Sequence, residues 1–552
     1  MKEGAFGSLD QKSLQAICGH LDGKSLAIFQ TLNHEARRAA DADIPLWREA
    51  YRREFPCYFS QRERYHRTTS WRAAYAARQR AEKCWSDYSP LEPIVMIENR
   101  GRSLLAIEFL EDPFPANFAL SGALIESSEA GEFMLYNLDA IRKTETTIDN
   151  MNTLNTSGIN PIESSAMQLI PVKNMSGESS TLPAGIFHIA QRPNTHQLAV
   201  TTLSTRAHIL RLKQKKKESE EDVEDEDIDM MNVGQEVHNE HTISSQQQSD
   251  RAAMNRANGH HHRHRHPSSP SSSSNTCQLE IEYDLAGHTG GCATVRINSD
   301  KAVTACFDGH IRVFDLPPSS PKSSIDQNNE APTTAATANN NNNNGVPIKN
   351  FNTNNITTTS NQCRTPEVLH PIATFTDDRE HTHQPPLTEQ NRGVCGLALS
   401  STAHRIVSGS NDMQIKVWDT ATGRITLRLG GCYGWPWWVE GLDSELNTVA
   451  TSSTDGYVRV WDLRAGQPSL ATHLSTDSIN DIYPVATVVP RVDGNYLVAG
   501  SFDTSIYVID RRMGRVVKDL RGHTDRLARV ALTGDTLLSC AFDGKVALHG
   551  FG

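Results

Sequence analysis

The chain has 552 residues, a formal net charge of −11 and only 37% hydrophobic residues. This negative charge disfavours bulk electrostatic binding to nucleic acid or to an anionic membrane surface. No apolar run approaches the roughly 18 residues of a membrane span, and the first residues contain no signal-peptide core. The ten cysteines include no Cys-x-x-Cys pair, so we expect no zinc ribbon and no disulfide framework, but a soluble protein of the cytoplasm, the nucleus or both.

The N-terminal residues predict a small helical bundle, because apolar residues recur there with the spacing of one helix face. Two such runs are Leu14, Ile17 and Leu21, and then Trp47, Tyr51 and Phe55. Asp22 and Gly23 lie between helical patterns, where a cap or turn is expected.

The remainder is rich in β patterns, and five segments share one frame. Each has an apolar run, a small residue, an Asp in a tight turn, alternating β-branched residues and a residue of aromatic or aliphatic type six positions after the Asp. The segments are residues 302–316, 406–420, 449–463, 497–511 and 537–551. Each predicts two strands joined by a hairpin. Weaker copies at 123–138 and 198–212 bring the total to seven.

These units resemble WD repeats, in which a His, a strand Ser or Thr, the turn Asp and a Trp hold a four-stranded blade together. The matching positions are His288, Asp308, Asp412, Trp418, Asp455, Trp461, Asp503, His523 and Asp543. The resemblance implies a mainly β fold, a seven-bladed propeller, with a strand near residues 93–99 closing the ring. Five true repeats plus other β structure is the alternative.

Three tracts that interrupt the repeats predict disorder, at about 143–164, 213–276 and 317–366. They are rich in Asn, Ser, Thr, His or charge, and contain too few apolar side chains to offset a chain entropy of about 1–2 kcal/mol per residue. Each follows the third strand of a repeat. We therefore expect them at the opposite end of the propeller from the turn Asp residues, which leaves the top face open.

Two N-terminal segments resemble parts of F-box/WD-repeat proteins. Residues 8–56 resemble an F-box, and residues 69–85 resemble the W-R-x-x-Y…W helix that links F-box to propeller. The F-box positions are Leu9, Leu14, Ile17, Leu21, Leu26, Phe29, Leu32, Leu46 and Trp47. The segment departs from the family in lacking a Pro after Leu9 and in having Asn33-His34-Glu35 where a basic or aromatic dipeptide is usual. The implied domains are 8–56 (F-box-like), 57–90 (linker helices) and 91–552 (propeller).

The resemblance implies the substrate-recognition subunit of an SCF-type ubiquitin ligase. In that family the F-box docks on a Skp-type linker subunit, which binds the cullin, and the propeller holds a protein substrate by a short degron. Such a receptor acts by positioning, so we expect no catalytic residue, metal or cofactor, and the sequence contains no Walker, HExxH or GxSxG motif. Candidate docking residues are Leu14, Ile17, Leu21, Leu26, Leu46 and Trp47, each with packing in the bundle core as its alternative role. A WD-repeat scaffold of a non-ubiquitin complex is the alternative function.

The candidate substrate-binding residues of the top face are Phe307, Arg392, Asn411, Glu440, Thr454, Phe502, Arg526 and Phe542. Phosphodegron-binding relatives carry arginines before the turn Asp or on the first strand. The first-strand positions here, aligned on local pattern, are Ala293, Cys395, Glu440, Asn480 and Ala528, none of them an arginine. The three phenylalanines, with Trp435, Trp437, Trp438 and an acidic residue, predict an apolar or basic peptide instead of a strictly phosphorylated one. Packing between blades is the alternative role of these aromatic residues.

Overall fold

The computed structural model describes residues 18, 20–32, 44–57, 70–87, 95–98, 102–113, 118–123, 132–142, 166–173, 182, 185–215, 276–318, 366–377, 392–474 and 482–551. It separates into two compact units, residues 1–213 with 277–552 and residues 214–276. The elements below belong to the first unit, except for the ends of two strands that cross its boundary. The three predicted inserts lie almost entirely outside the described residues, as do Leu14 and Ile17.

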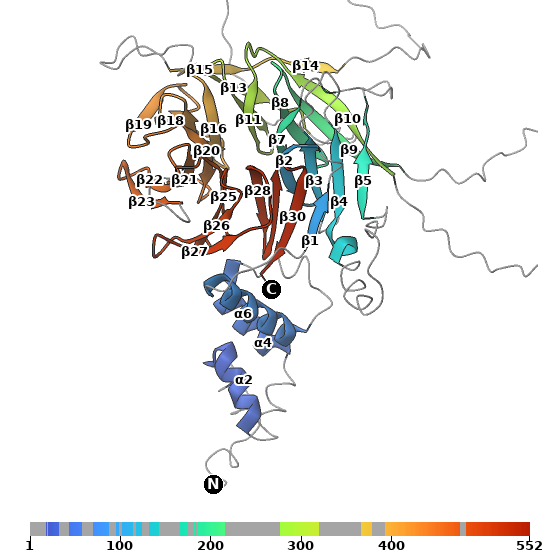
Figure 1. Cartoon of the computed structure of the whole chain (residues 1–552), viewed down its shortest axis with the longest axis vertical. Coiled ribbons are helices and arrows are strands. Elements are labelled where there is room, and N and C mark those ends of the chain that lie inside the picture. The colour runs from blue at the N-terminus through green and yellow to red at the C-terminus, as the bar shows by residue number, and fades with distance from the viewer. Residues whose placement is uncertain are drawn as a thin grey trace, which may run out of the picture. The chain divides into compact units, whose positions relative to one another are not determined.

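The N-terminal part contains three labelled helices, α2 (Gly23–Leu32), α4 (Ile44–Glu54) and α6 (Trp71–Ser86) (Figure 1). Asp22 begins α2 as predicted, because its Oδ1 accepts a hydrogen bond from the Ser25 N–H at 2.7 Å. The apolar faces of the helices meet in one core cluster, formed by Cys18, Leu26, Phe29, Trp47, Tyr51, Phe55 and Tyr75. The predicted helical character of this part is confirmed for the described residues.

Seven sheets follow, each containing four blade strands that are hydrogen-bonded in order, and the sheet of the second blade has two further short strands. The first blade contains β2 (Leu104–Leu110), β3 (Phe118–Ala123), β4 (Phe133–Asn137) and β5 (Met167–Ile170). The second contains β7 (Ile186–Gln191), β8 (Gln197–Thr202), β9 (Ala207–Lys215) and β10 (Thr276–Leu285). The third contains β11 (Cys292–Ile297), β12 (Lys301–Cys306), β13 (His310–Asp315) and β15 (Ala373–Thr376).

The remaining blades follow the same plan. The fourth contains β16 (Val394–Leu399), β17 (Arg405–Ser410), β18 (Ile415–Asp419) and β19 (Ile425–Leu429). The fifth contains β20 (Pro436–Gly441), β21 (Thr448–Ser453), β22 (Tyr457–Asp462) and β23 (Gln467–His473). The sixth contains β24 (Val485–Pro490), β25 (Tyr496–Ser501), β26 (Ile506–Asp510) and β27 (Arg515–Leu520). The seventh contains β28 (Leu527–Thr533), β29 (Thr536–Ala541), β30 (Lys545–Gly550) and β1 (Val95–Glu98).

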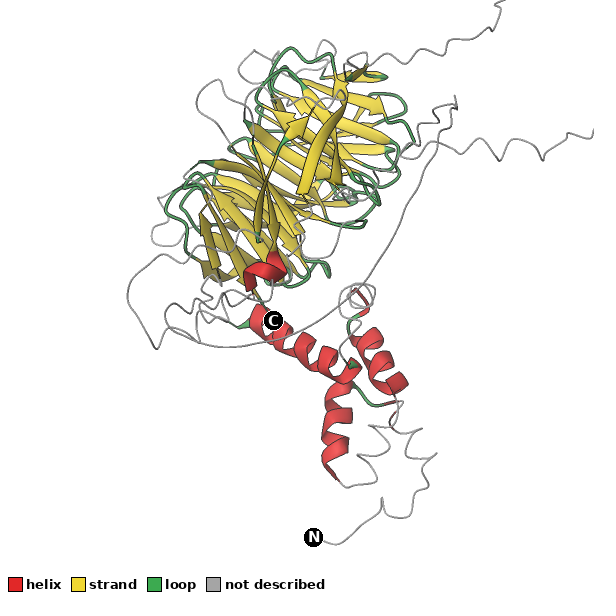
Figure 2. Cartoon of the chain, turned by 90° about the vertical axis from the view of Figure 1, so that its right-hand side faces the viewer, coloured by secondary structure: helices red, strands yellow, loops and turns green. Residues whose placement is uncertain are grey.

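The first strands of the blades form a closed ring. Each contacts the first strand of the next blade, and β28 of the last blade contacts β2 of the first. In Figure 1 the sheets lie around a common centre, and Figure 2 shows this region to be built almost wholly of strands. The fold is therefore the predicted seven-bladed propeller, with its apolar core lying between neighbouring sheets. One such cluster joins Val407 and Ile415 of the fourth blade to Val449 and Trp461 of the fifth.

The ring is closed by a strand from before the first blade. β1 pairs antiparallel with β30, from Val95 opposite Leu548 to Glu98 opposite Lys545. The predicted closing strand at 93–99 is therefore confirmed. The pairing gives the last blade its fourth strand from a segment some 450 residues earlier in the chain.

The second blade carries two short strands that the sequence did not predict. β14 (Glu367–Leu369) and β6 (Val172–Lys173) both pair parallel with β10, at opposite ends of that strand. β10 is the outer strand of its blade, so these pairings cover part of an otherwise open edge.

α6 connects the helical core to the propeller. Trp85 near its end is fully buried and stacks on Phe551, with ring centres 3.8 Å apart, and its Nε1 donates to Asp535 Oδ1 at 3.0 Å. The buried Arg78 of the same helix forms an ion pair with Asp535 at 2.5 Å, and Arg491 pairs with Glu82. The sequence predicted this tryptophan as part of the linker helix, and the structure shows that it fixes the helix to the sixth and seventh blades.

Candidate functional site

The two ends of the propeller differ in which loops they carry. The hairpins between the second and third strands, which contain the turn Asp residues, lie at one end of the propeller. We call this end the upper end. The lower end bears the loops between first and second strands, including Asp535, which contacts α6. The connections β4–β5, β9–β10 and β13–β15, which contain the predicted inserts, also leave from the lower end, as expected from the strand order. The upper end is the candidate functional face.

The five predicted hairpins share one turn geometry. The residue after the turn Asp has a positive φ in every case: Gly309, Met413, Gly456, Thr504 and Gly544. Glycine adopts this conformation without a steric cost, which is why three of the five turns read Asp-Gly. The turn Asp also accepts backbone hydrogen bonds, as from the Thr289 N–H to Asp308 and from the Thr524 N–H to Asp543.

The predicted tryptophans hold their blades together through the second strand. Trp418 Nε1 donates to Ser408 Oγ at 2.8 Å, and Trp461 Nε1 donates to Thr451 Oγ1 at 2.9 Å. In the seventh blade, His523 hydrogen-bonds Ser539 at 2.8 Å and Asp543 at 3.0 Å. In the third blade, His288 hydrogen-bonds Thr304 at 3.2 Å.

Four blades also have a partner of the turn Asp that the sequence reading missed. The residue four positions after the turn Asp binds its carboxylate: Arg312 to Asp308 (2.9 Å), Lys416 to Asp412 (2.6 Å), Arg459 to Asp455 (2.8 Å) and Tyr507 to Asp503 (2.5 Å). The fourth and fifth blades have no Gly-His, so a cation on the third strand takes the role of the histidine. The recurring Asp-x-x-x-basic spacing was the available signal.

Every first strand has a β-bulge at its second residue, at the upper end. The register shifts between the first and third residues of all seven first strands, from Leu104/Ala106 in β2 to Leu527/Arg529 in β28. A bulge breaks the alternation of side chains, so two successive residues can face the same side. The bulged residues are Leu105, Phe187, Ala293, Cys395, Trp437, Ala486 and Ala528, and all seven line one central cavity.

This cavity has an aromatic wall and a volume of about 60 Å³. The remaining lining residues are Phe307, Phe502 and Phe542, from the positions before the turn Asp, and Trp438 and Arg529, from the third positions of their strands. The three phenylalanines are half-buried. The structure therefore brings together the predicted phenylalanines with Trp437 and Trp438, while Trp435 lies exposed outside the cavity wall.

The other predicted top-face residues lie around this cavity or apart from it. Asn411 accepts a hydrogen bond from the Cys395 thiol, and Thr454 accepts one from the Trp435 N–H. Arg392 is exposed, and the exposed Arg526 guanidinium lies 4.9 Å from the centre of the Phe542 ring.

Two first-strand positions are corrected by the structure. Trp437, not Glu440, is the bulged residue of the fifth blade, and Ala486 is that of the sixth, whereas Asn480 lies outside the described residues. Glu440 is the fifth residue of β20, and its carboxylate accepts hydrogen bonds from Arg296 at 2.5 Å and from Trp438 Nε1 at 3.2 Å. A paired carboxylate does not provide the open acidic group on which the expectation of a basic peptide rested. The error arose because this blade has no Gly-His to fix the alignment.

Charged side chains from several blades meet beneath the cavity. Trp438 lies between the guanidinium groups of Arg529 (3.9 Å from the ring centre) and Arg296 (4.8 Å), with the His188 ring edge-on at 5.1 Å. Burial lowers the pKa of Arg529 to about 10, so it stays cationic at neutral pH. Burial also raises the pKa of Glu108 to about 7, against the opposing effect of the two arginines.

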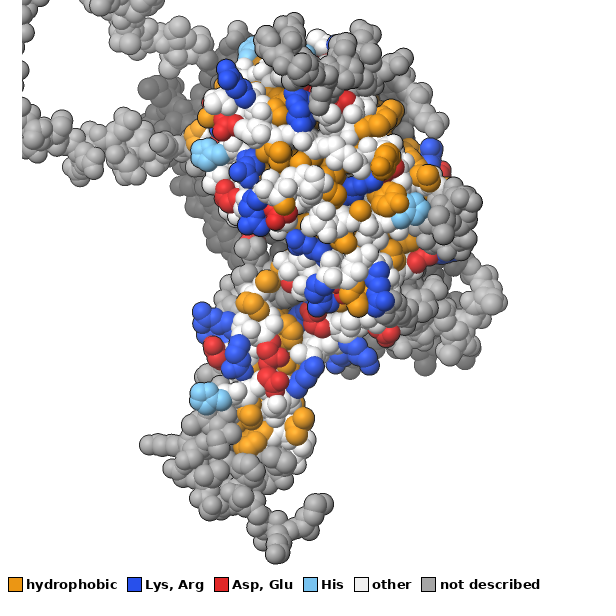
Figure 3. Space-filling model, turned by 90° about the vertical axis from the view of Figure 1, so that its left-hand side faces the viewer, with side chains coloured by type: hydrophobic (Ala, Val, Ile, Leu, Met, Phe, Trp, Pro, Cys, Tyr) orange, Lys and Arg blue, Asp and Glu red, His pale blue; other side chains and the backbone are white. Residues whose placement is uncertain are grey.

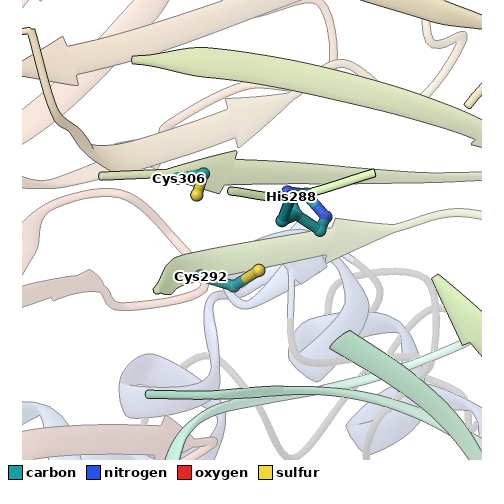
Figure 4. A group of neighbouring side chains, drawn as sticks. All are labelled: His288, Cys292 and Cys306. Carbon is teal, nitrogen blue, oxygen red and sulfur yellow. The ribbon is translucent and has the colours of Figure 1, made fainter. Parts of the chain in front are cut away.

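His288, Cys292 and Cys306 form the one group of three clustered metal-ligand side chains among the described residues (Figure 4). Their ligand atoms lie within 4.8 Å of one another. Both histidine nitrogens already have partners, since Nε2 faces Thr304 and Nδ1 accepts from the Arg312 guanidinium at 3.0 Å. This adjacent cation opposes a bound metal ion, so the group fits a structural role in the third blade. Hydrogen bonds from Cys292 and His288 lower the pKa of the Cys306 thiol.

The four predicted docking residues that the structure describes lie in or beside the helical core, while Leu14 and Ile17 lie outside the described residues. Leu26 and Trp47 are buried in it, and Leu21 and Leu46 pack partly buried against it. Core packing alone accounts for Leu26 and Trp47. The described apolar side chain that α2 leaves in solvent is Ile28, which is 64% exposed and which the sequence reading did not select.

The surface carries mixed charge on the side that Figure 3 shows. Basic, acidic and hydrophobic side chains are interspersed there, without a continuous basic patch over the described residues. None of the helices that the structure describes combines the length and hydropathy needed to cross a membrane.

A family model described as "WD domain, G-beta repeat" matches residues 381–419, which include the first three strands of the fourth blade. No curated protein matches the chain. The repeat match and the seven-bladed propeller together support a WD-repeat protein. Propellers of this kind are usually non-catalytic scaffolds or receptors.

Proposed function

We propose that the chain is the substrate-recognition subunit of an SCF-type ubiquitin ligase. Its N-terminal helices dock on a Skp-type linker subunit and through it on a cullin, and its upper end binds a short peptide degron. The observation that carries the proposal is the double attachment of α6. Tyr75 in its first half packs in the helical core, and Trp85 in its second half packs on the propeller.

A receptor of this kind needs such a connection because it works by positioning. It raises the local concentration of substrate lysines beside the enzyme that modifies them, and a loose link between its two binding modules lowers that concentration. α6 contacts the lower end of the propeller, at Asp535, so the helices leave the cavity at the upper end free for a substrate. The half-buried phenylalanines of the cavity favour a peptide with an apolar anchoring side chain.

Co-purification of the full-length protein with the recombinant linker subunit and the cullin N-terminal domain tests the docking. We expect a Kd below about 1 μM for the native chain. Leu14→Asp combined with Ile17→Asp is expected to abolish binding, and Ile28→Asp is expected to weaken it at least about tenfold, because it puts a carboxylate on the exposed side of α2 without altering the core. Met513→Asp is the matched control, since Met513 is a similarly exposed (55%) side chain of the sixth blade. A folded native chain that does not bind the linker contradicts the proposal.

The second candidate is a WD-repeat scaffold whose helices bind another partner. The missing Pro after Leu9 and the Asn33-His34-Glu35 sequence favour it, because both depart from the F-box pattern. This function would be assigned if the chain does not bind the linker subunit but binds another protein, and if Ile28→Asp abolishes that binding.

A further inference from the structure

The cavity at the upper end is lined by one buried arginine among the described residues. Arg529 is only 6% exposed, yet it lines the cavity. Within the part of the chain that the structure describes, its guanidinium has neither a hydrogen bond nor an ion pair, and its close neighbour is the face of Trp438. Taking a charge out of water is costly unless it is paired, so a buried guanidinium that lines an open cavity is suited to bind an anionic group.

Arg296, the second arginine beside Trp438, has polar partners for its guanidinium. Arg296 donates to the carbonyl oxygens of Leu397 at 2.8 Å and Val439 at 3.1 Å, and it pairs with Glu440. These contacts tie the third, fourth and fifth blades together. Arg529 makes none of this kind, so interblade bonding does not account for its charge.

We propose that Arg529 is a carboxylate-binding residue, and that the cavity takes an apolar peptide segment bearing a carboxylate, from an Asp or Glu side chain or from a chain terminus. The guanidinium donates two parallel hydrogen bonds to the carboxylate, while the phenylalanine rings above it cover the apolar neighbours. This inference rests on the proposed function, because it names the chemistry of the peptide that the upper end binds. It replaces the apolar or basic peptide expected from the sequence.

The charges around Arg529 favour a carboxylate over a phosphate. Among the described residues that line the cavity, Arg529 provides the one guanidinium, and the carboxylates of Glu108 and Glu440 both act on it electrostatically. A phosphate dianion would meet that negative charge beside a single lining arginine, whereas phosphate sites usually combine several donors or cations.

The same neighbours make binding depend on pH. The groups that face Arg529 are Glu108, His188, Arg296 and Glu440 from the other first strands and Cys540 from β29. Burial raises the pKa of the Cys540 thiol to about 12, so it stays neutral. His188 stays neutral because burial holds its pKa well below the usual range. Glu108 ionises near pH 7 and then competes with a bound carboxylate for Arg529. Binding is therefore expected to weaken several-fold between pH 6 and pH 8.

An array of random peptides, synthesised with a free C-terminal acid and again with a C-terminal amide, tests the proposal on the full-length protein. We expect the binding peptides to contain a carboxylate whose replacement by the amide (Glu→Gln, Asp→Asn or C-terminal amidation) weakens binding at least about tenfold. If binding requires the free C-terminal acid, the carboxylate that Arg529 binds is a chain terminus. If binding requires one internal Asp or Glu, it is a side chain. Arg529→Met is expected to remove the preference and Arg529→Lys to retain part of it. The control Arg464→Met, which removes an exposed guanidinium between β22 and β23 at the lower end, is expected to leave it unchanged.

Four results would overturn the proposal: unchanged binding after neutralisation of every carboxylate, unchanged binding by Arg529→Met, binding that requires a phosphate, or an array without binders. If Arg529→Met fails to fold, judged by circular dichroism, the comparison of Arg529→Lys with Arg464→Met decides. Linker binding is measured on the same variants. Its retention by Arg529→Met separates a failure here from a failure of the SCF assignment.

Discussion

The two ends of the propeller differ in how far their polar and aromatic groups are satisfied. At the lower end, Trp85 is stacked and hydrogen-bonded, and Asp535 receives both Trp85 and Arg78. At the upper end, phenylalanine rings are half-buried around a cavity and the Arg529 guanidinium has no ion pair among the described residues. A permanent contact between two parts of the chain has its polar and aromatic groups paired within the chain. A contact with a partner that must form and dissociate leaves such groups available for the partner. Changes at the lower end should therefore cost stability, and changes at the upper end should cost binding.

The largest expected effect is at the lower end. Trp85→Ala removes a fully buried ring that stacks on Phe551 and should lower the free energy of unfolding by about 4 kcal/mol. Urea denaturation followed by circular dichroism measures it. Trp435→Ala is the control, since that ring is 40% exposed at the upper end, and its cost should stay below about 1 kcal/mol. Equal losses of unfolding free energy in the two variants would contradict the proposed difference between the two ends of the propeller.

Asp535→Ala should have the next largest effect, about 2–3 kcal/mol, because it takes one carboxylate partner from the buried Arg78 and removes the acceptor of the Trp85 Nε1 hydrogen bond. The matched control is Asp525→Ala, which removes an exposed carboxylate whose ion pair with Arg526 is 3.6 Å long. That change should cost less than about 1 kcal/mol in the same measurement. A loss below about 1 kcal/mol for Asp535→Ala would show that α6 is held by the tryptophan alone.

Glu108→Gln tests the electrostatics beneath the cavity. The folded protein raises the pKa of Glu108 from 4.5 to about 7, so it favours the neutral carboxyl. The resulting stability is fully present below pH 4.5 and is lost as the pH rises through about 7. Since Glu108 is partly exposed, we expect this loss to be about 2 kcal/mol in the native chain and absent in the variant. Urea denaturation of both proteins at pH 5 and pH 8 measures the difference, and parallel pH dependence would contradict the assignment.

The propeller was predictable because its signals are local and repeated. Each turn Asp lies a fixed six residues before the next-to-last residue of its third strand, and this spacing located five blades without reference to the rest of the chain. The closing strand β1 followed from counting strands. β6 and β14 were not predictable, because strands of two and three residues form only where the edge of β10 is available.

The cavity was predictable only in part. The phenylalanines were found because they precede the turn Asp residues. Arg529 was missed because Ala528 was taken as the residue facing the centre, whereas the bulge turns both residues toward the cavity. The same bulge pairs Trp437 with Trp438 in the fifth blade. A register shift of one residue is set by hydrogen bonds between strands and leaves no mark in the sequence of either strand.

The smallest expected change in stability belongs to the upper end. Phe542→Ala removes a half-buried ring of the cavity wall, which should cost about 1 kcal/mol of unfolding free energy and weaken peptide binding at least about tenfold. The control is Met513→Ala, an exposed side chain of the sixth blade outside the cavity, which should leave both quantities unchanged. Denaturation and peptide titration on the same preparations give the two numbers. A variant that loses several kcal/mol of stability would show that the ring packs between blades, and a variant that keeps full peptide affinity would show that the anchor lies elsewhere on the upper end. Loss of peptide binding at little cost in unfolding free energy would show that the ring serves to bind a partner and not to pack the fold.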